Sequence, residues 1–177
     1  MTIETIRESL PDYAKDLKLN LGNVLATPNM TANQLWGTAL ASAIATRNHT
    51  LLKAIAAEAK NHLSPEAQRA AKGAAAIMGM NNIYYRFVHL VSDKEYGKIP
   101  ANLRMTIIGN SGVDKQDFEL WALAVSAING CGMCLDSHEQ ILVKHGMTRA
   151  VIQNAVRIAS TIHAVGLTLE AEEILAE

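Results

Sequence analysis

Apolar residues recur at intervals of three and four along most of the chain, which is the pattern of amphipathic α-helices. The first predicted helix covers Thr2 to Leu19, and Pro11 is expected to divide or bend it. No segment shows a sustained alternation of apolar and polar residues, which half-buried strands would require. The pattern therefore predicts an all-α protein.

Capping residues, glycines and prolines predict where the other helices begin and end. A connector is expected over 22–30, and Thr31, Ser64 and Asp114 are typical N-caps. Ser64 is followed by a proline at the first helical position. Gly166 is expected to break the last helical stretch. The predicted helices after the connector run from Thr31 through Ile44 and over about 49–62, 64–91, 101–108, 114–130, 131–144, 148–166 and 168–175.

Two stretches match at an offset of about 84 residues. Ala41–Ala45 resembles Val125–Asn129, and a Leu-Trp pair precedes each stretch. We therefore predict one domain, 1–177, made of two similar helical modules over about 31–92 and 115–177. In the first module, Arg47, Thr50 and Ala54 occupy the positions equivalent to Cys131, Cys134 and His138, so the chemistry is expected in the second module only.

Composition and charge narrow the possible partners. Apolar residues make up 49% of the chain and aromatic residues 5%, which suits closely packed helices. The net charge is −1 and there is no basic run, so we expect no nucleic-acid partner. No apolar run approaches the ~20 residues of a membrane span. The N-terminus lacks the pattern of a signal peptide, and we expect a cytoplasmic protein.

The segment from Gly130 to Glu139 holds both cysteines. In a helix, Cys131, Cys134 and His138 would share one face, at i, i+3 and i+7. The first turn of a helix favours a thiolate, and a neighbouring histidine can accept the thiol proton. Gly130 and Gly132 are expected to leave the sulfurs lightly covered. In a reducing compartment, such a pair is typical of catalysis or metal binding rather than of a permanent cross-link.

Two other interpretations of the cysteines are weaker. They could be small packing residues in a helical core, although the glycines and His138 argue against this. A structural zinc site needs four ligands, usually in two pairs, and the chain offers no second pair of suitable spacing. We expect no bound cofactor or metal.

The cysteine segment and its surroundings resemble the alkyl hydroperoxidase D family of the carboxymuconolactone decarboxylase-like superfamily. The similarity extends over essentially the whole chain and is strongest at Phe118–Trp121, Ser126–Cys131, Cys134, His138-Glu139 and Tyr96–Met105.

This resemblance implies an all-helical homotrimer that reduces hydroperoxides with a cysteine pair. It makes Cys134 the peroxidatic thiol, Cys131 the resolving thiol, and His138 and Glu119 members of a proton relay. It also implies dihydrolipoamide or a lipoyl-bearing protein as the reductant, and the peroxiredoxin alkyl hydroperoxide reductase C as a possible partner. The chain departs from the family pattern at Met133, where well-known members carry a histidine, so a proton-transfer role is not carried over to this position.

Two competing functions remain open from the sequence. One is a decarboxylase-like enzyme of the same superfamily, which would not need the cysteine pair. The other is a redox-sensing protein whose disulfide only switches its assembly. Met78 and Met105 are expected to be packing residues, and Tyr84–Phe87 to lie in the core, with the pocket or a subunit interface as the alternative.

Overall fold

The computed structural model describes residues 1–175, and within them every regular element is a helix, which confirms the all-α prediction. The elements in chain order are α1 (Ile3–Ser9), η1 (Asp12–Ala14), α2 (Lys15–Leu25), α3 (Ala32–Thr46), α4 (His49–Ala59), α5 (Pro65–Leu90), η2 (Lys94–Lys98), α6 (Thr106–Gly109), α7 (Lys115–Asn129), α8 (Gly132–Lys144) and α9 (Arg149–Leu175). None of the described helices combines the length and the apolarity needed to cross a membrane.

The predicted N-caps begin the helices as expected. The Thr31 hydroxyl accepts a hydrogen bond from the Gln34 amide, and the Gln34 side chain accepts one from the Thr31 amide. Ser64 caps α5 with Pro65 at its first position, and Asp114 caps α7. Each cap satisfies N–H groups that have no partner inside the helix, so these boundaries are fixed locally.

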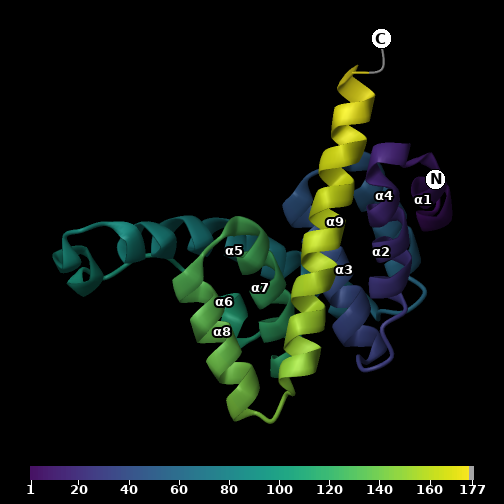
Figure 1. Cartoon of the computed structure of the whole chain (residues 1–177). Coiled ribbons are helices and arrows are strands. Elements are labelled where there is room, and N and C mark those ends of the chain that lie inside the picture. The colour runs from purple at the N-terminus through teal and green to yellow at the C-terminus, as the bar shows by residue number, and fades with distance from the viewer. Residues whose placement is uncertain (176–177) are drawn as a thin grey trace.

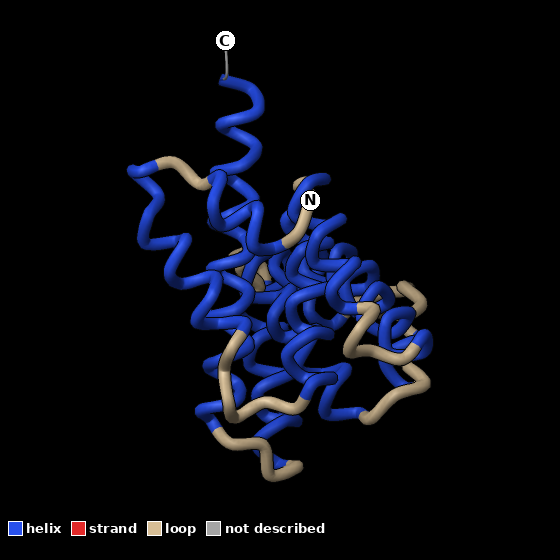
Figure 2. Tube along the Cα trace, turned by 90° about the vertical axis from the view of Figure 1, so that its right-hand side faces the viewer, coloured by secondary structure: helices blue, strands red, loops and turns tan. Residues whose placement is uncertain are grey.

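Helices α3 and α7 form the centre of the bundle. Both pack against α5 and α9, as well as against each other, and α8 packs on α7 and α5 (Figure 1). Figure 2 shows helices and loops, and no strand, in the described part of the chain. Trp121 of α7 is fully buried, and its indole N–H donates to the Asn33 carbonyl at the start of α3. The indole lies where a side chain at Gly37 would be, so glycine lets α3 and α7 approach closely.

Gly166 does not break a helix, contrary to the prediction. Helix α9 runs without interruption from Arg149 to Leu175. A Cβ atom at Gly166 would overlap the Thr46 side chain at the end of α3. The glycine therefore permits a close contact between two helices, and this information is absent from the local sequence.

Two other predicted boundaries were wrong. Helix α2 extends through Gly22 to Leu25, and the Arg7 guanidinium occupies the space beside this glycine. The helix expected over 101–108 is reduced to Thr106–Gly109. Asn102 has a left-handed φ of 52°, which is incompatible with a regular right-handed helix across that stretch.

The internal repeat stays a prediction, and the order and lengths of the helices support it. Helices α3 and α7 each have 15 residues and end at a left-handed residue, Arg47 and Gly130, with φ of 67° and 68°. Shorter helices follow, and then α5 and α9, with 26 and 27 residues. Because Asn48 and Cys131 are the N-caps of those shorter helices, they align with each other, one position away from the predicted match with Arg47.

The end of α5 and η2 project from the bundle as an arm, which we define as residues 83–99 (Figure 1). The Phe87 and Tyr96 rings meet edge to face, with centroids 5.2 Å apart, and hold η2 against α5. The expectation that Tyr84–Phe87 lie in the core was wrong, since Phe87 is 48% exposed and the other three are only half-buried. Large apolar side chains are exposed along the arm at Ile83, Phe87, Leu90, Tyr96 and Ile99.

Candidate functional site

The turn between α7 and α8 places the two cysteines. Gly130 adopts the left-handed conformation that ends α7, and Cys131 then serves as the N-cap of α8. The Cys131 sulfur accepts a hydrogen bond from the Cys134 amide at 3.4 Å. A disulfide joins the two residues, whose Cα atoms are 5.3 Å apart. The sequence spacing therefore does bring the sulfurs together, at the first turn of a helix.

The two sulfurs are more deeply covered than expected from the flanking glycines. Cys131 is fully buried and Cys134 is 6% exposed, because α8 lies against both α7 and α5. Only Cys134 of the pair lines a cavity, which has a volume of about 350 Å³. Cys134 is therefore the sulfur that a small molecule in this cavity would meet.

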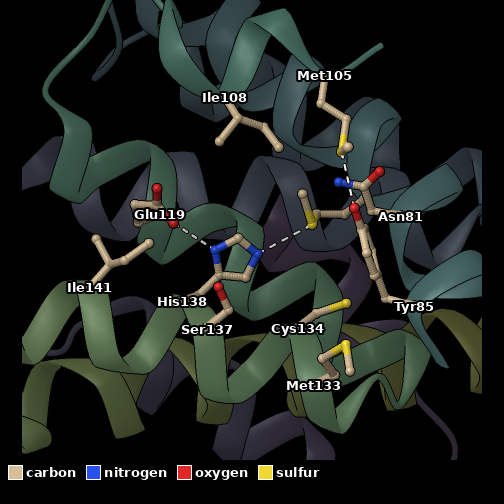
Figure 3. Close-up of a pocket in the computed structure, with 11 residues that line it drawn as sticks. Asn81, Tyr85, Met105, Ile108, Glu119, Met133, Cys134, Ser137, His138 and Ile141 are labelled. Carbon is tan, nitrogen blue, oxygen red and sulfur yellow. Dashed lines mark hydrogen bonds and ion pairs between the residues drawn. The ribbon is translucent and has the colours of Figure 1, made fainter. Parts of the chain in front are cut away.

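The cavity lies between α5, α7 and α8, with α6 and the residue before it forming part of its wall (Figure 3). Its lining is mainly apolar or made of thioethers, with a small number of polar groups. The lining residues are Met78, Asn81, Tyr85, Met105, Ile108, Glu119, Met133, Cys134, Ser137, His138 and Ile141. Such a lining suits an organic molecule that carries a small polar group.

Glu119 and His138 form a buried pair beside the cavity. The Glu119 Oε2 atom lies 2.6 Å from His138 Nδ1, and the two residues are 1% and 7% exposed. Glu119 lies on α7, inside the bundle. A buried carboxyl is tolerated when it is paired in this way.

The other nitrogen of His138 faces a sulfur. His138 Nε2 lies 3.3 Å from Met78 Sδ, so the ring is held between Met78 and Glu119. Figure 3 shows the ring with Glu119 on one side. A thioether sulfur accepts hydrogen bonds but has no proton to donate, so this contact is a hydrogen bond only in a tautomer that carries a proton on Nε2. The histidine–carboxyl pair lies next to the cavity that Cys134 lines, where it can accept or return a proton.

A polar network behind the cavity fixes the end of α7. Asn82 of α5 donates to the Ser126 hydroxyl at 2.8 Å and accepts from the Asn129 side chain at 3.0 Å. The Arg86 guanidinium donates to the Asn129 carbonyl. Because Asn129 directly precedes the turn into Cys131, these bonds anchor the segment that carries the cysteine pair.

Much of the cavity wall consists of residues that are far from the cysteines in the sequence. Met78 and Met105 were expected to be packing residues. Met78 does belong to the hydrophobic core, but both side chains also line the cavity, and Asn81 was not singled out. These residues precede Cys134 by 29 to 56 positions, so local patterns could not group them with it. The sequence did contain one signal for this wall. Met78, Asn81 and Tyr85 have the i, i+3, i+7 spacing of residues on one helix face, and they follow the alanine-rich part of α5.

The sequence matches known proteins across its length. Residues 94–177 match the carboxymuconolactone decarboxylase family. The chain is 60% identical to alkyl hydroperoxide reductase AhpD of Streptomyces coelicolor, over 99% of both chains. It is 59% identical to the AhpD of Streptomyces griseus over the full length of both, and 56% identical to that of Rhodospirillum centenum over 99% of this chain and 94% of the other. The chain therefore belongs to the AhpD group of the carboxymuconolactone decarboxylase family.

Proposed function

We propose that this protein is an antioxidant thiol peroxidase that reduces alkyl hydroperoxides by cycling Cys131 and Cys134 between dithiol and disulfide. The observation that carries the proposal is the Cys131–Cys134 disulfide, one sulfur of which lines a cavity beside the buried Glu119–His138 pair. The relatives bear the name alkyl hydroperoxide reductase, which agrees with this chemistry.

The different burial of the two cysteines supports different roles for them. In this proposal Cys134, which lines the cavity, is the peroxidatic thiol, and Cys131, which is fully covered, is the resolving thiol. The Cys134 thiolate attacks the distal peroxide oxygen, the O–O bond breaks, and an alcohol leaves as Cys134 becomes a sulfenic acid. The Cys131 thiolate then attacks that sulfur, the hydroxyl leaves as water after taking up a proton, and the disulfide forms.

Helix α8 and the Glu119–His138 pair support the proton transfers. Cys134 lies in the first turn of α8, where the unpaired N–H groups and the helix dipole favour a thiolate. His138 accepts the thiol proton, and the Glu119–His138 unit returns a proton to the departing alcohol as a proton relay. Met133 lines the same cavity but has no ionisable proton, so it shapes the cavity and does not join the relay.

The reductant in this proposal is a dithiol on a slender arm, such as dihydrolipoamide or the dihydrolipoyl group of a carrier protein. A thiol that enters the cavity meets Cys134, forms a mixed disulfide with it and releases Cys131 as a thiolate. A second thiol of the same arm then frees Cys134. The reduced enzyme can also pass electrons to a peroxiredoxin such as alkyl hydroperoxide reductase C. Such a cycle needs a reducing compartment, and we place the protein in the cytoplasm.

The exposed apolar arm supports the proposal of a homotrimer. Ile83, Leu90 and Ile99 are 64%, 70% and 58% exposed on a segment that projects away from the bundle (Figure 1). Exposed apolar residues gathered in one segment typically mark an interface. We assign this surface to a second copy of the chain, in keeping with the homotrimer that the family resemblance implies.

Turnover of cumene hydroperoxide with dihydrolipoamide tests the proposed function directly. A peroxidase consumes both substrates in equal amounts, with catalytic turnover that requires Cys134. A decarboxylase-like enzyme or a simple redox switch would show no such turnover. No feature of the described residues favours either alternative, and the cavity next to Cys134 has no role in a switch.

A further inference from the structure

Asn81 is a buried polar residue whose side chain makes no hydrogen bond to the described residues. It is 4% exposed, and its Oδ1 atom is fully enclosed with no hydrogen-bond partner among residues 1–175. Buried polar side-chain atoms are nearly always hydrogen-bonded in native proteins. An enclosed carboxamide oxygen without a partner therefore destabilises the fold, unless a ligand satisfies it.

The neighbouring asparagine shows the contrast. Asn82 is equally buried, but its carboxamide bonds to Ser126 and Asn129 and so holds helices α5 and α7 together. Asn81 points the other way, into the cavity that Cys134 and His138 line (Figure 3). Tyr85, one turn further along α5, also lines the cavity, and its hydroxyl has only a weak contact of 3.9 Å with the Met105 sulfur.

The chemistry of a carboxamide matches that of a hydroperoxide. The group R–O–OH offers one O–H donor and two acceptor oxygens, and a carboxamide offers one acceptor and two donors. The rest of the cavity wall, including Met78, Ile108 and Ile141, suits the organic group R. We propose that Asn81 binds the peroxide oxygens of the substrate, an inference that rests on the proposed peroxidase function.

The proposal assigns Asn81 a role in the first chemical step. The carboxamide turns about its Cβ–Cγ bond so that the enclosed Oδ1 reaches the cavity and accepts from the terminal O–H, which directs the distal oxygen to the Cys134 sulfur. The thiolate gives an electron pair to that oxygen as the O–O bond breaks, and the proximal oxygen leaves with the bonding pair. The Asn81 N–H stabilises the negative charge on this oxygen, and the Glu119–His138 unit supplies the proton that completes the alcohol. Sulfenic acid and alcohol account for all atoms and electrons.

Asn81→Leu and Asn81→Ala test this role through the two half-reactions measured separately. We expect the reduced variants to react with cumene hydroperoxide about 10-fold or more slowly than the wild type, because a donor to the developing charge is lost. We expect the oxidised variants to react with dihydrolipoamide within twofold of the wild-type rate. The thermal midpoint of Asn81→Leu should equal or exceed that of the wild type, because an unpaired polar group is replaced by an apolar one of similar size.

The matched control is Asn154→Leu, which changes another buried asparagine, on α9, that does not line the cavity. It should leave both half-reactions unchanged. The proposal is overturned if Asn81→Leu and Asn81→Ala react with the hydroperoxide at the wild-type rate, or if both half-reactions fall together with the thermal midpoint. A slower reaction with dihydrolipoamide alone would mean that Asn81 binds the reductant and not the peroxide, and it would also overturn the proposal. A wild-type enzyme inert to hydroperoxides refutes the proposed function itself, and this inference with it.

Discussion

A carboxyl group as deeply buried as that of Glu119 is rare in proteins unless it is paired. Its partner, His138, is held from its other side by Met78, so the ring is fixed at both nitrogens. In the proposed mechanism, this geometry prepares the histidine for proton transfer before any substrate enters. It also makes each partner dependent on the other, since removal of one leaves the other unpaired in the interior.

Glu119→Gln should therefore slow the reaction with hydroperoxide by about 100-fold, the usual effect of losing a positioned acid or base. Glutamine keeps the size of the side chain but cannot share a proton with His138. Stopped-flow measurement of Cys134 oxidation checks this. Asp136→Asn, an exposed change on α8, is the control and should have no effect. A Glu119→Gln rate within twofold of the wild type contradicts the relay.

A second buried acid should control the pH dependence of stability. Burial raises the pKa of Asp117 above its usual 3.8, and Asp114 adds to this, while a hydrogen bond with Asn33 opposes it. Because the folded-state pKa is the higher one, the free energy of unfolding falls as pH rises from about 3.8 through the folded-state pKa. Asp117→Asn should raise the thermal midpoint at pH 7, and the gain should shrink towards zero below pH 3.8. A gain that stays constant with pH contradicts this assignment.

At the scale of single helices, the sequence was informative wherever the cause is local. The caps Thr31, Ser64 and Asp114 act within three residues, and their helices begin where predicted. Glycines mislead because a helix tolerates them when another element needs the space. Gly22 makes room for Arg7, and Gly166 for Thr46, and neither contact is visible in the local pattern.

Gly37→Ala should destabilise the fold by about 1–3 kcal/mol, because the added methyl group would overlap the buried Trp121 ring. Gly79→Ala is the matched change on α5, where a Cβ atom meets nothing within 4 Å. It should stabilise the helix by about 0.4–1 kcal/mol. Urea denaturation of both variants measures the difference. Equal effects of the two substitutions contradict the close packing of α3 on α7.

The site is predictable from sequence only in part, for a similar reason. The spacing of Cys131, Cys134 and His138 is local, and the structure brings the two sulfurs together. Glu119 could be assigned a role only through the family resemblance, because its approach to His138 depends on how α7 and α8 pack. The wall formed by Met78 and Asn81 depends on α5, a helix from the other half of the chain.

At the scale of the whole molecule, the exposed arm should form the interface between the copies of the chain and so determine the oligomeric state. Phe87→Glu places a charge on the apolar surface of the arm, and we expect it to convert a trimer into monomers. Light scattering after size-exclusion chromatography measures this. Leu167→Glu, a change at an exposed apolar position on α9, should leave the trimer intact. A monomeric wild-type protein, or a Phe87→Glu variant that remains trimeric, contradicts the assignment of the arm.

The central claim is that Cys134 is the sulfur that meets the peroxide and Cys131 the one that resolves it. Mass spectrometry of reduced Cys134→Ser and Cys131→Ser variants, after one equivalent of cumene hydroperoxide and a sulfenic-acid trap, tests it most directly. The account predicts trapped sulfenic acid at Cys134 in Cys131→Ser, and no rapid oxidation of Cys134→Ser. Sulfenic acid formed rapidly at Cys131 in Cys134→Ser, with Cys134 unmodified in Cys131→Ser, would contradict it.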